Sequence, residues 1–467
     1  TISKATPIPK GDTSQEITNY RPIAIPPVPA KIFESTIFFQ LYRKTISNIP
    51  PQQHGFVKGR SINTNLVELT HGIRQALDRG IASQVDVIYT DFQKAFDKVD
   101  HEILLRKLDS LGYSEALLEL FKSYLKDRRQ YVVYKGKSSD LFGCPSGVPQ
   151  GSNLGPYLFM LYISDIHSAI NNSSCLLYAD DLKLYREIKD ERDQHLLQKD
   201  LDQIAEWSDM NKLPLNINKC GKMTFTHKSK THLIMTEYNI KQIKLKSYEK
   251  VKDLGVILDS KLYFKEQIQL TRSKANKNMG IIMRHSRFFR NADTIRMLYL
   301  TLVGSILDFA SVVWSPLGKG NSKNLERTQK RFLKFLYFKN FEYYESEIKY
   351  SELLLGYELV TLEIKRDMAA LLFLRDIVNS QVDSAYLLEK VNFFAPTRIG
   401  RIRNSLFSTP PSRTTHFEAT PIHYAQLLFG KLERIDSAID IFFNSRITFK
   451  HKVQEALLKL YQNVTVT

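Results

Sequence analysis

Cysteine is scarce in this sequence of 467 residues, which holds only Cys144, Cys175 and Cys220. Three widely separated thiols cannot build a disulfide framework, and their spacing is not that of zinc ligands, so a reducing compartment is expected. Long apolar runs are missing too. The most apolar long stretch, 298–317, is interrupted by Asp308 and is better explained as a buried helix than as a membrane span.

Glycine and proline are not abundant either, with 20 and 17 residues, which excludes collagen-like and low-complexity chains. Hydrophobic residues make up 43% of the chain and aromatic residues 11%, which is too much for intrinsic disorder. At about 150 residues per domain, the length indicates two to four domains. Because residue 1 is Thr and no basic-then-apolar leader follows it, we expect an excised segment without a targeting signal.

Positive charge is what the sequence has in excess. The 66 Lys and Arg residues against 49 Asp and Glu give a net charge of +17. Net charge does not determine the fold, but it favours a polyanionic partner, because neutralising phosphates releases counterions. The excess is dense over 261–300, where nine basic residues face two acids. A soluble basic protein without a nucleic-acid partner is the alternative at this point.

Two apolar patterns of strand length each end at acidic residues. Residues 85–89 (VDVIY) form a β-branched run that leads to Asp91. The runs CLLY and LKLY frame Ala-Asp-Asp, which predicts a tight hairpin with Asp180 and Asp181 at its turn. Elsewhere the Pro- and Gly-rich residues 1–60 predict short strands and loops, and apolar periodicity predicts helices over much of the remainder.

Adjacent carboxylates at a turn between apolar strands need an explanation. A solvated turn is one, because Asp is common in turns. A divalent cation is the other, because Mg²⁺ binds one or two carboxylates together with substrate phosphates. Two such ions, roughly 4 Å apart, activate an attacking hydroxyl and stabilise the leaving pyrophosphate. Asp91 and Asp180 could bridge them if their strands are neighbours.

Seven sequence blocks occur in an order that points to one family. In chain order the blocks are NYRPI (19–23), GFVKGRS (55–61), YTDFQKAFDKVDH (89–101), SGVPQGSNLGPYLF (146–159), LLYADD (176–181), LPLNINKCGKM (213–223) and DLGVILD (253–259). Together they resemble the reverse transcriptase of non-LTR, LINE-type retrotransposons of the jockey-like sort. The resemblance covers about 10–340 strongly and the rest weakly, and it implies a fragment without the endonuclease.

The resemblance implies roles for the matching residues. Asp91, Asp180 and Asp181 would be the catalytic acids and metal ligands, with the Phe92 carbonyl as a further ligand. Lys219 would be a catalytic residue that protonates departing pyrophosphate, for which a solvated lysine is the alternative. The residues implied to bind dNTP are Lys10, Arg21, Phe92, Phe96 and Gln150. The residues expected to bind nucleic acid are Arg60, Arg284, Arg287, Arg290, Lys330 and Arg331.

Two of these roles have a physical basis and a plainer alternative. A planar guanidinium suits phosphate contact, but for Arg21 alone a surface ion pair would be the default. Phe96 matches the position that excludes a 2′-hydroxyl, and it could equally be a buried aromatic residue. The implied fold is an α+β right-hand polymerase. Its parts would be truncated fingers (1–84), a palm with an antiparallel sheet and a primer-grip hairpin (85–260), a helical thumb (261–345) and a mostly helical C-terminal region (346–467).

The implied function is RNA-directed DNA polymerase, a nucleotidyltransferase with two Mg²⁺ ions, for which Mn²⁺ could substitute. Its partners would be an RNA template, a DNA primer or target and dNTPs, with no membrane, and its location intracellular, in the nucleus. The alternative is a catalytically inactive, basic RNA-binding remnant of a truncated element. An intron maturase or other cellular reverse transcriptase matches the wording of the blocks less well. The intact set of Asp91, Gln150, Asp180 and Asp181 favours the enzyme.

Overall fold

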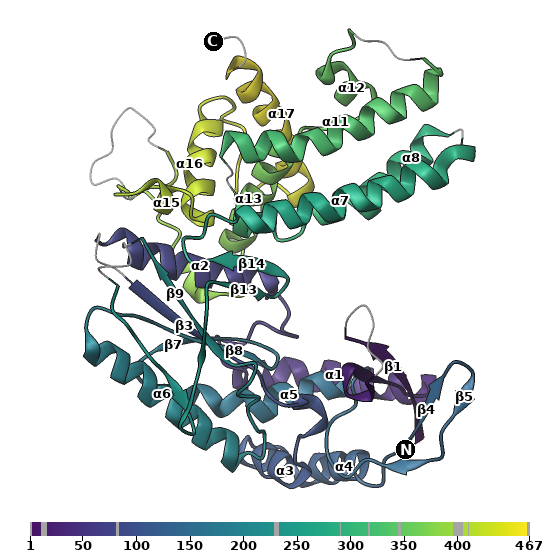
Figure 1. Cartoon of the computed structure of the whole chain (residues 1–467), viewed down its shortest axis with the longest axis vertical. Helices are drawn as coiled ribbons and strands as arrows, with labels where there is room; N and C mark the ends of the chain where they lie inside the picture. Colours follow the sequence, from purple (N-terminus) through teal and green to yellow (C-terminus); the bar gives the residue numbers. More distant parts are fainter. Residues whose placement is uncertain are drawn as a thin grey trace. The chain divides into compact units, whose positions relative to one another are not determined.

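A computed structural model describes residues 2–10, 16–80, 84–227, 233–289, 291–315, 318–343, 347–395, 405–409 and 411–464 (Figure 1). The chain divides into two compact units, and each is interleaved in sequence with the other. Unit 1 comprises Thr1–Ser61, Gln84–Thr224 and Ser229–Tyr248, and unit 2 comprises Ile62–Ser83, Phe225–Lys228 and Glu249–Thr467. Among the described residues, no helix combines the length and the apolar character needed to cross a bilayer.

The central sheet of unit 1 has the strand order β12-β9-β3-β8-β7. These strands span Lys246–Tyr248 (β12), Gly221–Thr226 (β9), Gln84–Thr90 (β3), Asp181–Glu187 (β8) and Ser174–Tyr178 (β7). The predicted strand at 85–89 and the predicted hairpin are both confirmed, and β3 and β7 each pair with β8 in antiparallel fashion. β12 instead joins β9 in parallel, so the palm sheet predicted to be antiparallel is mixed at this edge.

Helices supply much of the core of unit 1. They are α1 (Val28–Thr45), α3 (His101–Ser110), α4 (Glu115–Leu125), α5 (Leu154–Ile163) and α6 (Glu191–Met210). α5 is almost wholly buried, because its sequence LGPYLFMLYI has no charged residue. α6 is amphipathic and packs its buried face, which includes Leu197, Leu201 and Ile204, beside the sheet (Figure 1).

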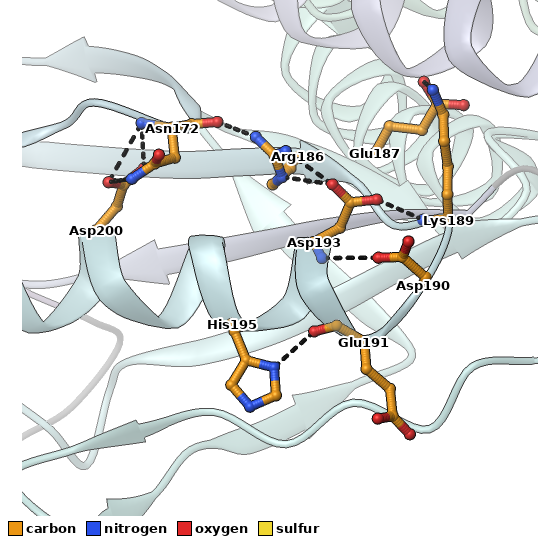
Figure 2. A network of polar contacts seen from close by, with 9 residues as sticks. All are labelled: Asn172, Arg186, Glu187, Lys189, Asp190, Glu191, Asp193, His195 and Asp200. Atoms are coloured by element: carbon orange, nitrogen blue, oxygen red, sulfur yellow. Dashed lines mark hydrogen bonds and ion pairs between the residues drawn. The ribbon is translucent and has the colours of Figure 1, made fainter.

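Ion pairs and hydrogen bonds fix the start of α6 to the hairpin of β7 and β8 (Figure 2). The Asp190 carboxylate caps the helix by accepting the N–H of Asp193 at 3.1 Å. The Asp193 carboxylate accepts from Arg186 of β8 at 2.7 and 3.0 Å. Two turns further along the helix, Asp200 accepts the backbone N–H of Asn172, just before β7, at 2.9 Å. The helix therefore braces the base of the hairpin whose tip carries Asp180.

A second sheet of unit 1 is formed by β1 (Ile2–Pro9), β2 (Tyr20–Ile25), β4 (Arg129–Tyr134), β5 (Lys137–Ser138) and β6 (Phe142–Gly143). The prediction of only short strands and loops over 1–60 is wrong, because α1 is a helix of 18 residues. Pro27 lies at its N-cap and Pro29 in its first turn, where a missing N–H costs no intrahelical hydrogen bond. The prolines that suggested loops mark a helix start.

Unit 2 is mostly helical, as predicted for the residues after 260. Its elements are α2 (Ile62–Asp78), β13 (Lys250–Asp253), β14 (Val256–Asp259), α7 (Lys265–His285), α8 (Ala292–Tyr299), α9 (Ser305–Asp308), α10 (Ser311–Trp314), α11 (Lys319–Phe341), α12 (Tyr350–Gly356), α13 (Leu362–Val378), α14 (Ala385–Glu389), α15 (Thr415–Glu418), α16 (Pro421–Glu433) and α17 (Arg446–Val464). A π-helical turn over Leu300–Gly304 interrupts the apolar stretch between α8 and α9. β13 and β14 form the hairpin that the sequence suggested as a primer grip.

The predicted α+β class is confirmed. The contact-based units do not follow the predicted domain boundaries, since α2 and the β13–β14 hairpin both belong to unit 2. The division into fingers (1–84), palm (85–260), thumb (261–345) and C-terminal region (346–467) stays a prediction.

Candidate active site

The acidic residues lie at one end of neighbouring strands. Thr90, the last residue of β3, pairs with Leu182 of β8, so Asp91 comes immediately after that pair. In the hairpin, Tyr178 pairs with Asp181, which leaves Ala179 and Asp180 as a two-residue turn. Ala179 has a φ of 57°, in the left-handed region that a tight hairpin turn requires. Sequence reasoning could not establish this adjacency, and the structure provides it.

The surroundings of Asp180 disfavour its charged form. Burial raises the pKa of Asp180, and the negative charge of Asp91 raises it further, while Arg21 and Lys219 oppose the shift. The Nζ atom of Lys219 lies 3.3 Å from Oδ2 of Asp91. Asp181 is exposed. A half-buried pair of like charges with cationic side chains around it is typical of a functional site.

The residues present fit a divalent cation. Among the described residues, no three or more His, Cys, Asp or Glu side chains gather closely enough to form a complete metal shell. Asp91 and Asp180 give two carboxylates, the number that Mg²⁺ usually takes when substrate phosphates and water complete its shell. Near them Phe92 bridges Leu215, and the flanking hydrogen bonds use the Asp91 carbonyl and the Gln93 N–H. Those bonds do not engage the Phe92 carbonyl, the further ligand implied by the resemblance.

Cys220 holds the backbone of Asp91, which the sequence did not reveal. The Asp91 N–H donates to Sγ of Cys220 at 3.5 Å, and the Asn216 N–H donates to the Asp91 carbonyl at 2.7 Å. The Cys220 N–H in turn donates to the Asn216 carbonyl at 3.1 Å, which closes the turn. Cys220 is fully buried. Its place next to Lys219 in the block LPLNINKCGKM was the one available signal.

Phe96 and Gln150, which are implied to bind dNTP, lie in two segments that contact each other around Asp97. Phe96 is half-buried, and its ring stacks on Phe159 with centroids 4.4 Å apart. Nε2 of Gln150 donates to Oδ1 of Asp97 at 3.0 Å. Gly147 has a φ of +86°, and a Cβ there would come within 2.7 Å of the Asp97 carbonyl, so this close approach requires glycine. Burial raises the pKa of Asp97, and its orienting role was missed in the sequence.

Arg21 and Lys10 extend from the second sheet. Arg21 on β2 is exposed and pairs in register with Ile8 of β1. Burial raises the pKa values of Asp180 and Asp97, and the charges of Arg21 and Lys10, respectively, oppose these rises. The structure thus brings Arg21 within electrostatic reach of the acidic pair, as a triphosphate ligand would need to be.

The six residues expected to bind nucleic acid have different surroundings. Arg284 and Arg331 are exposed on α7 and α11. Nζ of Lys330, also exposed, lies 5.8 Å from the centroid of the Tyr350 ring. Arg290 and the side chain of Arg287 lie outside what the structure describes. Their role in binding stays a prediction.

Arg60 differs from that set because its guanidinium is directed at its own chain. Nη1 donates to the carbonyls of Pro50, Pro51 and Gln53 at 2.9, 3.2 and 2.8 Å. Gln53 in turn contacts Ala179, beside Asp180, and was also missed in the sequence, where it precedes the block GFVKGRS.

The Asp91–Asp180 pair thus lies at the ends of antiparallel strands, with Lys219 3.3 Å from Asp91. Residues 8–258 match the sequence model of the family described as "Reverse transcriptase (RNA-dependent DNA polymerase)". The chain belongs to this family, and the predicted resemblance to it is confirmed.

Named relatives come from transposons. The chain is 28% identical over 338 residues to "Probable RNA-directed DNA polymerase from transposon BS" of Drosophila melanogaster, covering 69% of this chain and 37% of that protein. It is also 28% identical over 277 residues to the polymerase from mobile element jockey of the same species, covering 55% and 29%. The chain thus spans about a third of the length of these curated relatives. A solved apo telomerase from Candida tropicalis aligns with a TM-score of 0.40 and 12% identity over 78% of this chain and 63% of that one, which is too distant to support an assignment.

Proposed function

We propose that this chain is the RNA-directed DNA polymerase of a non-LTR retrotransposon. The reaction is attack of a primer 3′-hydroxyl on the α-phosphorus of a dNTP, with an RNA template and a DNA primer or target as partners. The observation that carries the proposal is the Asp91–Asp180 pair at the ends of β3 and β8, with Nζ of Lys219 3.3 Å from Asp91. Family membership and the names of the transposon relatives support it.

Each residue of the site has a task in this reaction. Asp91 and Asp180 would hold two Mg²⁺ ions, with the Phe92 carbonyl and Asp181 as further protein ligands. When bound, Mg²⁺ lowers the pKa of the attacking hydroxyl and stabilises the charge on the leaving pyrophosphate. Lys219, 3.3 Å from Asp91, donates a proton to that pyrophosphate.

The remaining site residues select and orient the nucleotide. Arg21 and Lys10 contact the triphosphate, for which a guanidinium offers two parallel donors. Gln150 contacts the incoming nucleotide, and its amide is oriented by Asp97. Phe96 occupies the space that a 2′-hydroxyl would need, which favours dNTP over ribonucleotide.

Primer extension on an RNA template with Mg²⁺ tests the proposal. Asp180→Asn and Asp91→Asn are each expected to abolish extension while RNA affinity and folding are kept, because both side chains are partly exposed and act as ligands. Glu206→Gln, an exposed acid on α6, is the charge-matched control. Extension by Asp180→Asn at the wild-type rate would refute the proposed mechanism. RNA binding without extension by the unmodified chain would favour the inactive RNA-binding remnant.

A further inference from the structure

The turn formed by Ala179 and Asp180 is supported by a segment on the side of β7 that faces away from β8. The proposed function gives this segment no role. Residues 52–54 run beside β7, where the Leu177 N–H donates to the Gln52 carbonyl at 2.9 Å. The His54 N–H donates to the Leu177 carbonyl at 2.8 Å. This short segment pairs with the edge of β7 that faces away from β8, so the hairpin is held from both sides.

At the turn itself a side chain continues this pairing. Oε1 of Gln53 accepts the Ala179 N–H at 2.9 Å, and Nε2 of Gln53 donates to the Ala179 carbonyl at 3.2 Å. The carboxamide thus satisfies both backbone groups of Ala179, as a neighbouring peptide unit would in a ladder. Ala179 needs such support because its φ is positive, and it directly precedes Asp180.

The Gln53 carboxamide is itself fixed. Its Oε1 also accepts the Gly55 N–H at 2.9 Å, and the residue is only 1% exposed. The Arg60 guanidinium donates to the carbonyls of Pro50, Pro51 and Gln53 itself. Gly55 packs its backbone against the turn, since a Cβ there would lie 2.4 Å from the Ala179 nitrogen.

We infer that Gln53 and Arg60 are positioning residues for Asp180. Arg60 fixes the conformation of residues 50–53 and so orients the Gln53 side chain. Gln53 in turn fixes the backbone of Ala179, which determines the direction of the Asp180 carboxylate. This inference rests on the proposed function, and it replaces the expectation that Arg60 binds nucleic acid. Nη1 of Arg60 already donates to three backbone carbonyls. These hydrogen bonds hold the guanidinium against its own chain, where it is poorly placed to contact a phosphate.

The inference predicts a specific kinetic pattern. Gln53→Met keeps the length of the side chain and removes both hydrogen bonds to Ala179. Arg60→Met removes the hydrogen bonds to the carbonyls of residues 50–53. Each is expected to lower kcat about 100-fold, because misplacing a catalytic group by about 1 Å has an effect of that size. RNA affinity and its salt dependence stay at wild-type values. Lys58→Met, an exposed lysine two residues before Arg60, removes the same charge from the same loop and is the matched control.

A second readout does not depend on turnover. Mn²⁺ binding measured by electron paramagnetic resonance reports on the Asp91–Asp180 pair directly, so it remains informative if the chain proves inactive as a polymerase. Gln53→Met and Arg60→Met are expected to weaken Mn²⁺ binding about tenfold, while Lys58→Met leaves it unchanged. Arg60→Lys keeps a donor and a charge, and should recover part of both the affinity and kcat even if Arg60→Met folds poorly.

Two results would overturn the inference. One is Mn²⁺ binding by Gln53→Met equal to that of Lys58→Met, whatever the polymerase activity of the chain. The other is a flatter plot of log K against log salt for Arg60→Met, by about 0.9 for one lost phosphate, with kcat unchanged. That second pattern would return Arg60 to the nucleic-acid-binding residues.

Discussion

Replacing Phe96 by Val separates a role in sugar selection from a role in packing. The ring is half-buried and stacked on Phe159 at 4.4 Å. Removing a fully buried Phe side chain costs about 3–5 kcal/mol, and Val at a half-buried position should lose about 1–2. Loss of the aromatic pair adds about 1 kcal/mol. A total of about 2–3 kcal/mol is smaller than a typical folding free energy of about 5–15 kcal/mol, so the variant should stay folded.

The functional effect has its own magnitude. If the ring overlaps the 2′-hydroxyl of a ribonucleotide, removing it relieves crowding of about 1–3 kcal/mol. That corresponds to a rise of about 5- to 150-fold in kcat/KM for ribonucleotide relative to dNTP. The assay is primer extension with the two nucleotides in competition. Phe121→Val, in the core of α4 and fully buried, is the packing control.

The two variants should differ in their effect on sugar selection. Phe121→Val is expected to lower the free energy of unfolding without changing the sugar ratio. An unchanged ratio for Phe96→Val, with lower stability, would show that Phe96 only packs and that the reasoning from its place in the site is wrong.

Three further predictions concern the surroundings of the site. Cys220→Val removes the acceptor for the Asp91 N–H, so kcat should fall about tenfold while RNA affinity is kept, and Cys220→Ser should recover most of the rate; equal rates for Val and Ser would contradict this. Burial alone would raise the pKa of Asp193, but the hydrogen bonds and the ion pair of its carboxylate lower this pKa below the ordinary value. The carboxylate therefore contributes its full stabilisation above the unfolded-state pKa, and this stabilisation is lost as the pH falls through the folded-state pKa. Chemical denaturation between about pH 6 and 3 should show this loss, and Asp193→Asn should lack it. Arg284→Gln and Arg331→Gln should each flatten the salt dependence of RNA binding by about 0.9, and an unmoved slope would place the contact elsewhere.

The strands and the acidic residues of the site were predictable because their signals are local. A β-branched run leading to Asp91, and two apolar runs framing Asp180, each lie within a few residues. The supports of these residues were not predictable in the same way. Gln53 contacts Ala179 across 126 residues, and Cys220 contacts Asp91 across 129, with no periodicity to connect them. Such contacts are fixed by tertiary packing, which leaves no trace in the local pattern.

One local signal was misinterpreted instead. The prolines before residue 30 predict loops, whereas α1 begins at Val28 with Pro29 in its first turn. Proline is compatible with both structures, and the apolar residues that follow are split between exposed and buried positions, so they give little helical periodicity.

The interleaving of the two units has a consequence for how this chain is synthesised. Helix α2 is synthesised long before several of the residues that it contacts. Arg74 on α2 donates to the carbonyl of Ala419, 345 residues later, and Asp78 accepts the Thr414 N–H. Until α10, α14 and α15 are synthesised, the face of α2 that they contact stays uncovered, a state that favours chaperone binding and aggregation. An expression fragment that stops at residue 258, where the family match ends, would leave that face exposed permanently. We therefore expect that the segment matching the family model does not fold stably alone.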